Sequence, residues 1–156
     1  MDLVREPEGS VLFGWLAPGV FFARFAGRLS ATMNEAQIGA LQRAVDSTSS
    51  LRYFADCSQL TAYDLMARAA FVRVIVNNRH KFQEVVVWDW SGSPTQNGKT
   101  LAQTIGEPVT ICHDRAPFEA RLALAAPAHH AWVLRMPPDA RPRERRPDSS
   151  LPRDRS

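Results

Sequence analysis

The chain has 156 residues, of which 45% are hydrophobic, and this length and composition suit one globular domain with its own core. Of its 19 basic and 16 acidic residues, seven arginines and four acids lie at positions 135–156, which leaves 12 of each sign before them. The body is therefore neutral, and no basic face for nucleic acid is expected on it. No apolar run approaches the roughly 20 residues that span a bilayer, and the acidic start MDLVREPEGS lacks the apolar centre of a secretory signal. We expect a cytoplasmic protein without stable membrane insertion.

The chain is expected to open with a hairpin after a loose, polar N-terminus at residues 1–9. Apolar runs at 10–16 and 20–25 predict its two strands. Pro18 and Gly19 between them indicate a turn, because Pro fixes one dihedral angle and Gly permits a positive one.

A first helix is expected after the hairpin and should end near Asp46. Ser30 and Thr32 precede it, and Thr32 and Glu35 have the spacing of a capping box.

The stretch 51–80 is the centre of the prediction. LRYFADCSQL predicts a buried strand whose alternate residues point to opposite sides of a sheet. The turn TAYD follows, and Thr61 or Asp64 is expected to cap a long helix over 64–78 by accepting a hydrogen bond from an unpaired backbone N–H.

This long helix is apolar around nearly its whole circumference. One stripe recurs at helical spacing and comprises Leu65, Ala69, Val72 and Val76. A second apolar side comprises Met66, Ala67, Ala70, Phe71 and Val74. A helix of this kind is buried on more than one side. The second side, with Phe71 and Val74 at its centre, is therefore expected to lie either beneath another segment of this chain or beneath a partner.

The later elements are predicted in sequence. They are a strand at 85–90 with a valine run typical of burial on both faces, a loop at 91–97, a short helix at 98–105, a strand at 109–112 and a helix at 115–125 capped by Asp114. Residues 127–156 are rich in Pro and Arg and are expected to form a mostly disordered tail.

The element order β–β–α–β–α–β–α–β–α predicts an α/β domain with a mixed sheet. It resembles the STAS or SpoIIAA-like fold, whose relatives include anti-sigma factor antagonists and a SEC14-like lipid-binding group. The resemblance rests on LRYFADCSQL, TAYD and the long helix, with DRAPFEARLAL similar to the closing helix. It implies a SpoIIAA-like sandwich over residues 10–126, with four to five strands and about four helices.

The sequence departs from the resembled family at one functional position. Anti-sigma factor antagonists carry a DSSG-type motif whose serine is phosphorylated at the start of this helix. Asp64 matches the Asp, whereas Leu65, Met66 and Ala67 replace Ser-Ser-Gly. The phosphoacceptor is absent and the phosphoswitch is not carried over, although the surface around the turn remains.

The favoured function is a non-catalytic, STAS-like regulatory module that binds another protein or itself. Its expected contact residues are Thr61, Tyr63, Asp64, Ala67, Phe71 and Val74.

Two other functions stay open. A lipid or small apolar ligand is one, held in a cleft lined by Trp15, Phe22, Trp88 and Trp90. An enzyme is the other, with Cys57 or Cys112 as nucleophile and His80 or His113 as base. No cofactor or metal is expected, because the adjacent His129 and His130 lack the rest of a ligand set.

Overall fold

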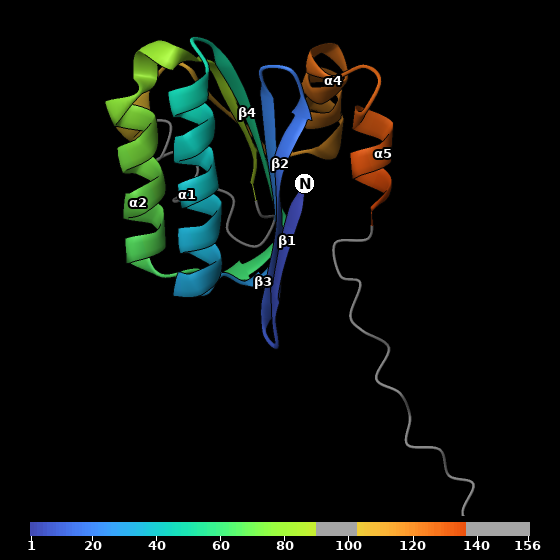
Figure 1. Cartoon of the computed structure of the whole chain (residues 1–156). Helices are drawn as coiled ribbons and strands as arrows, with labels where there is room; N and C mark the ends of the chain where they lie inside the picture. The colour runs from blue at the N-terminus through green and yellow to red at the C-terminus, as the bar shows by residue number, and fades with distance from the viewer. Residues whose placement is uncertain (90–102, 137–156) are drawn as a thin grey trace, which may run out of the picture.

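The computed structural model describes residues 1–89 and 103–136. It shows one six-stranded mixed sheet, with strand order β1-β2-β3-β4-β5-β6, between two layers of helices (Figure 1). The elements are β1 (Asp2–Glu6), β2 (Gly9–Ala17), β3 (Val20–Arg28), α1 (Ala31–Ser47), β4 (Leu51–Ala62), α2 (Leu65–Asn77), the 3-10 helix η1 (Arg79–Lys81), β5 (Phe82–Trp88), β6 (Val109–Cys112), α4 (Arg115–Ala125) and α5 (His130–Arg135).

The strand pairing changes from antiparallel to parallel at β3. β1, β2 and β3 pair antiparallel, and β3, β4, β5 and β6 pair parallel. Helices α1 and α2 cover one face, whereas α4 and α5 cover the other (Figure 1). Within the described residues, no helix is long and apolar enough to cross a bilayer.

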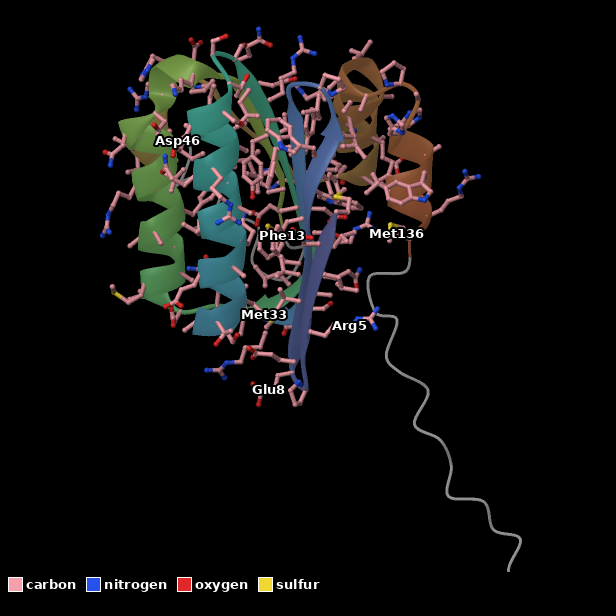
Figure 2. All side chains as sticks on the ribbon, viewed as in Figure 1. Arg5, Glu8, Phe13, Met33, Asp46 and Met136 are labelled. Carbon is pink, nitrogen blue, oxygen red and sulfur yellow. The ribbon has the colours of Figure 1, made fainter. Side chains whose placement is uncertain are left out.

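Two apolar cores flank the sheet, and strand alternation divides the side chains between them. On β4, Leu51, Tyr53 and Ala55 enter the α1/α2 core, and Phe54 enters the α4/α5 core. The α1/α2 core also contains Phe13 of β2 and Met33 of α1, which Figure 2 labels.

The predicted fold class is confirmed, with six strands instead of four to five. The hairpin forms at the expected turn, where Gly19 has a φ of 71°. The strand at 85–90 begins earlier than predicted, at Phe82, whose side chain is buried in the α1/α2 core. The loop at 91–97, most of the helix at 98–105 and the tail at 137–156 lie outside the described residues.

The expectation of loose ends is wrong at two places. Asp2–Glu6 forms the edge strand β1, because it pairs with β2 and places Val4 against the α1/α2 core. His130–Arg135 forms helix α5, because Val133 is fully buried in the α4/α5 core. Charged residues around the single anchor Val4 concealed β1 in the sequence, whereas the short apolar segment of α5 was assigned to the Pro- and Arg-rich tail that follows it.

The predicted cap of α1 is wrong and that of α2 is confirmed, whereas Asp114 occupies the N-cap position of α4 without a capping hydrogen bond from its side chain among the described residues. Helix α1 begins at Ala31, and the Ser30 side chain accepts a hydrogen bond from the Met33 backbone N at 3.1 Å. Thr32 therefore already lies in the first turn and forms no capping box. Asp64 caps α2, since its Oδ1 accepts a hydrogen bond from the Ala67 backbone N at 2.7 Å.

Candidate functional site

Helix α2 turns a different side to the sheet from the one that its leading apolar stripe suggested. Its buried residues are Ala67, Val74 and Ile75. Phe71 is half-buried against the core, with its ring centroid 5.8 Å from that of Tyr53. The chain's own core thus buries Val74 and part of Phe71, and the expectation that these two residues are the centre of a partner surface is corrected.

The outer face of α2 is defined here as Leu65, Met66, Ala69, Val72 and Val76 with the flanking Arg68 and Arg73. It lies on the side away from the sheet, and only Val72 of its apolar residues also packs against the α1/α2 core. Leu65, Met66 and Val76 are 80%, 72% and 42% exposed. An open groove of about 480 Å³ runs along this face, and its described lining is Leu65, Arg68, Ala69, Val72, Arg73, Val76, Asn77 and Thr104. The surface available to a partner is therefore the stripe that the sequence pattern listed first.

The six residues predicted to make contacts are divided by the fold. Thr61 and Asp64 are exposed, Tyr63 is half-buried, and Ala67 and Val74 are buried. Burial raises the pKa of the Tyr63 hydroxyl, and the nearby Arg68 guanidinium opposes that rise. The turn before α2 thus remains accessible, whereas Ala67 and Val74 are removed from the surface.

A sequence signal for the orientation of α2 did exist. The buried set with Phe71 has the spacing i, i+4, i+7, i+8, and Ile75 completes it. Arg68 and Arg73 both border the other stripe, and long cationic side chains keep their charged ends in water. The arginine-bordered stripe is therefore the one that should face solvent.

Comparison with solved structures identifies the architecture. An uncharacterized protein of the DUF3478 family from Shewanella loihica PV-4, described as having a SpoIIAA-like fold, superposes with a TM-score of 0.55. The match covers 76% of this chain and 98% of that one, at 14% sequence identity. The chain has the SpoIIAA-like fold. No family model matches the sequence, and no curated protein matches it.

The first turn of α2 in this SpoIIAA-like domain carries no hydroxyl. Leu65 and Met66 occupy it, both strongly exposed, directly after the capping Asp64. The position at which the resembled antagonists are phosphorylated is thus an apolar surface here.

The structure does not assemble the proposed tryptophan cleft. The Trp15 ring contacts Phe21 on the α1/α2 side of the sheet, with centroids 5.7 Å apart. Trp88 packs on the other side against Phe118, with centroids 5.6 Å apart. Trp15 and Trp88 therefore line no common cleft, and Trp90 lies outside the described residues.

Cys57 is not placed near His80. Parallel pairing sets Leu51 beside Phe82 and Asp56 beside Trp88, so His80 precedes one end of the strands and Cys57 lies near the other. Six strand residues separate those ends by roughly 20 Å. Burial raises the pKa of the Cys57 thiol strongly, with Asp56 and Asp89 adding to the rise, and the unreactive thiol form is favoured.

Cys112 is buried in the α4/α5 core. Burial raises the pKa of its thiol, Arg121 lowers it and Glu84 raises it. The neighbouring His113 places its Nδ1 3.9 Å from Oδ2 of Asp89, at the carboxyl ends of the strands. The raised pKa values disfavour a thiolate at both cysteines.

A buried ion pair on the α4/α5 side was missed in the sequence. Arg24 of β3 and Asp56 of β4 are 6% and 2% exposed, and Arg24 Nε donates to Asp56 Oδ2 at 2.8 Å. Arg24 Nη1 also donates to the Met136 carbonyl at 2.7 Å, which fixes the end of α5 (Figure 2 labels Met136). Asp56 Oδ1 accepts hydrogen bonds from the Ser58 backbone N and hydroxyl. The signal available in the sequence was a charged residue within each of two largely apolar stretches, namely Arg24 in VFFARF and Asp56 in LRYFAD.

Proposed function

We propose that this SpoIIAA-like domain is a non-catalytic regulatory module that binds a protein partner through the outer face of α2. The observation that carries the proposal is the exposure of Leu65 and Met66 in the first turn of α2 and of Val76 near its end. Large apolar side chains gathered on one element typically mark an interface.

The remaining exposed large apolar residues are dispersed over other elements. Among the described residues they are Met1, Leu3 of β1, Trp15 of β2, Leu124 of α4 and Trp132 of α5. Single apolar residues on a surface are ordinary and need no partner. The outer face of α2 differs because four of its five apolar residues, Leu65, Ala69, Val72 and Val76, line one groove.

The chemistry of the domain supports binding over catalysis. Both thiols have raised pKa values, which lowers the population of the nucleophilic thiolate. Without a hydroxyl in the first turn of α2, any control of binding acts by a route other than phosphorylation at that turn.

The test uses charges placed on the outer face. The double variant Leu65→Glu, Val76→Glu should keep the fold, because both side chains are exposed. In an interface formed by this face, each new carboxylate would lose its hydration, which weakens binding. Leu124→Glu on α4 is the matched control, since Leu124 is 83% exposed on the opposite layer. Substitution of Phe71 or Val74 would not serve, because both belong to the core contacts of α2.

Tagged protein is recovered from its native cells, and bound proteins are quantified by mass spectrometry. A protein enriched by the wild type is then purified, and its affinity is measured by calorimetry. We expect the double variant to bind it at least about tenfold more weakly, which is 1.4 kcal/mol, and Leu124→Glu to bind it normally. Equal recovery and equal affinity for all three proteins would refute the proposal.

A further inference from the structure

We propose that helix α5 is a detachable strap over the α4/α5 face of the sheet. In the closed state it lies on the sheet, as in this structure, and in the open state it leaves as a unit while the rest of the domain stays folded. The inference concerns the layer opposite α2 and does not depend on the proposed function. It is carried by the few attachments of α5, by the separate packing of α4 and by one hydrogen bond from a buried arginine.

Among the described residues, the attachments of α5 are few. The helix has six residues, and Val133 is the one that is fully buried. Ala131, Trp132 and Arg135 are exposed, and no side chain of the described residues caps the N-terminus of the helix. A helix this short is unstable in water on its own. α5 therefore keeps its helical form only while Val133 is docked, so docking and helix are lost together.

The neighbouring helix α4 is held by side chains of its own. It has eleven residues and buries Phe118 and Leu122. The Phe118 ring contacts those of Phe54 in β4 and Trp88 in β5, with centroids 5.9 Å and 5.6 Å apart. α5 lies beside α4 and follows it in the chain (Figure 1). Because segments with few buried side chains open at a lower free energy than the whole domain, α5 can leave while α4 stays in place.

Arg24 holds the strap closed. Its Nη1 donates to the carbonyl of Met136, the residue directly after α5, at 2.7 Å. Its Nε donates to Asp56 Oδ2 at 2.8 Å, and this bond does not involve α5. A hydrogen bond from a charged donor is stronger than a neutral one. When α5 leaves, water takes the place of the carbonyl, so the guanidinium keeps its carboxylate partner and is not left buried without an acceptor.

Opening of the strap uncovers apolar side chains of β2. Leu12 and Leu16 are 8% and 6% exposed in the same core as Val133. α4 packs on β5 and β6, so α5 is the element that covers the β2 side of this face. Leu12 lies directly opposite Arg24 in the pairing of β2 with β3. The open state thus presents an apolar strip beside a guanidinium, and the position of α5 regulates access to it.

The test compares two thiols in the α4/α5 core of the full chain. The variant Cys57→Ala, Val133→Cys places one thiol on α5 and retains Cys112 on β6. Labelling by iodoacetamide is followed by mass spectrometry, and each rate is divided by that of the same thiol in the urea-unfolded chain. We expect the thiol at position 133 to be labelled at least about 100-fold faster than Cys112 on this scale, because it becomes accessible when α5 alone opens.

Two results of this labelling would overturn the inference. Equal scaled rates would mean that α5 leaves only when the domain unfolds. A thiol at position 133 as reactive as in the unfolded chain would mean that α5 is not docked.

Amide hydrogen exchange of the unmodified chain makes the same comparison without a substitution in the core. The Val133 backbone N donates to the His129 carbonyl at 3.2 Å. Relative to its intrinsic rate, this amide should exchange at least about 100-fold faster than the Leu122 amide of α4. Equal protection of the two amides would contradict a strap that opens by itself.

The variant Arg24→Lys tests how the strap is held. An ammonium keeps the charge beside Asp56 but lacks the planar fork that reaches two acceptors. The labelling rate at position 133 relative to Cys112 should rise at least about fivefold. Arg135→Lys, at an exposed position of α5, is the matched control and should leave this ratio within about twofold of its original value. A parallel rise of both rates would mean that Arg24 stabilises the whole domain and does not hold the strap.

The uncovered strip is tested with the strap held open. Val133→Asp places a carboxylate at the buried anchor, whereas Ala131→Asp makes the same kind of change at an exposed position of α5. The first variant should give at least about threefold higher fluorescence of the apolar dye anilinonaphthalene sulfonate than the wild type and the second variant. No gain in fluorescence would overturn the uncovered strip. Labelling of Cys112 at its unfolded rate in Val133→Asp would show that the fold requires α5 and would overturn the inference as a whole.

Discussion

The two helical layers are held to the sheet by different kinds of interaction. On the α1/α2 side the buried polar side chains Asn34 and Gln37 are neutral amides, and Gln37 donates to the Tyr53 hydroxyl at 2.9 Å. On the α4/α5 side Arg24 and Asp56 form a buried ion pair. One layer is therefore fixed mainly by apolar packing, whereas the other adds charged, directional hydrogen bonds.

The outer surfaces of the layers also differ. Helix α4 exposes Leu124, whereas α2 exposes apolar residues that form a groove with arginines along it. The comparison shows that α2 needs only one apolar stripe to hold it on the sheet. Of its second stripe only Val72 also packs against the α1/α2 core, whereas Leu65 and Val76 are exposed, so the apolar character of these two residues suits another role.

The largest expected effect tests the charged layer. Asp56→Ala should lower the free energy of unfolding by about 3–5 kcal/mol, because it leaves the Arg24 guanidinium buried without its carboxylate. The Ser58 backbone N and hydroxyl lose their acceptor as well. Urea unfolding followed by circular dichroism measures the change.

The matched control replaces both partners, with Arg24→Met and Asp56→Leu. Apolar residues of similar volume remove the charges together, so stability should return to within about 2 kcal/mol of the wild type. A loss below about 1 kcal/mol for Asp56→Ala alone would contradict the assignment of a dry ion pair to this layer.

The next prediction compares the two stripes of α2. Val74 is 7% exposed in the α1/α2 core, and Val76 is 42% exposed on the outer face. Val74→Ala should cost roughly 2 kcal/mol, because buried methyl groups are lost and a cavity remains. Val76→Ala should change stability by less than about 0.5 kcal/mol, since Ala offsets the small loss with its higher helix propensity.

Urea unfolding of the two variants in parallel gives the difference directly. Equal costs would mean that the outer stripe is also packed against this chain, and the groove would lose its meaning as a free surface.

Much of the fold could be predicted from the sequence because local patterns determine it. The alternation in LRYFAD assigned side chains of β4 to the correct faces, and Pro18 and Gly19 located the hairpin turn. The edge strand β1 could not be predicted in this way, because its pairing with β2 and the single anchor Val4 hold its charged segment in place.

The candidate site was harder to predict for a tertiary reason. Apolar residues surround α2, so periodicity supplied two stripes without showing which one the sheet would cover. The ion pair depended on register, since Arg24 and Asp56 are 32 positions apart and meet only because β3 and β4 pair in parallel. The ion pair becomes definite only when the strands are assembled, whereas for α2 the arginines beside one stripe were a signal that periodicity alone does not contain.

The smallest expected effect compares the two thiols, which lie on opposite sides of the sheet. Burial raises the pKa of Cys57 above its ordinary value of 9.0, followed by the charges of Asp56 and Asp89, and burial also raises that of Cys112. When folding raises the pKa of a group, the contribution of that group to the free energy of unfolding is complete at pH values below its unfolded pKa. The contribution is lost as the pH rises toward the pKa in the folded state. The free energy of unfolding should therefore decline above about pH 9, where the unfolded chain releases thiol protons that the folded chain retains.

Replacement of each cysteine by alanine separates their contributions to this decline. Cys57→Ala should make the loss of stability between pH 8 and 10 shallower, and Cys112→Ala should do so less, because the pKa shift of Cys57 is the larger. Urea unfolding at pH 8, 9 and 10 measures the slopes. Tyr53, whose pKa burial also raises, should leave a residual decline in both variants toward higher pH. An unchanged slope for Cys57→Ala would mean that water reaches this thiol, so that the carboxyl ends of the strands on the α1/α2 side would be open to reactants and the case for a non-catalytic domain would weaken.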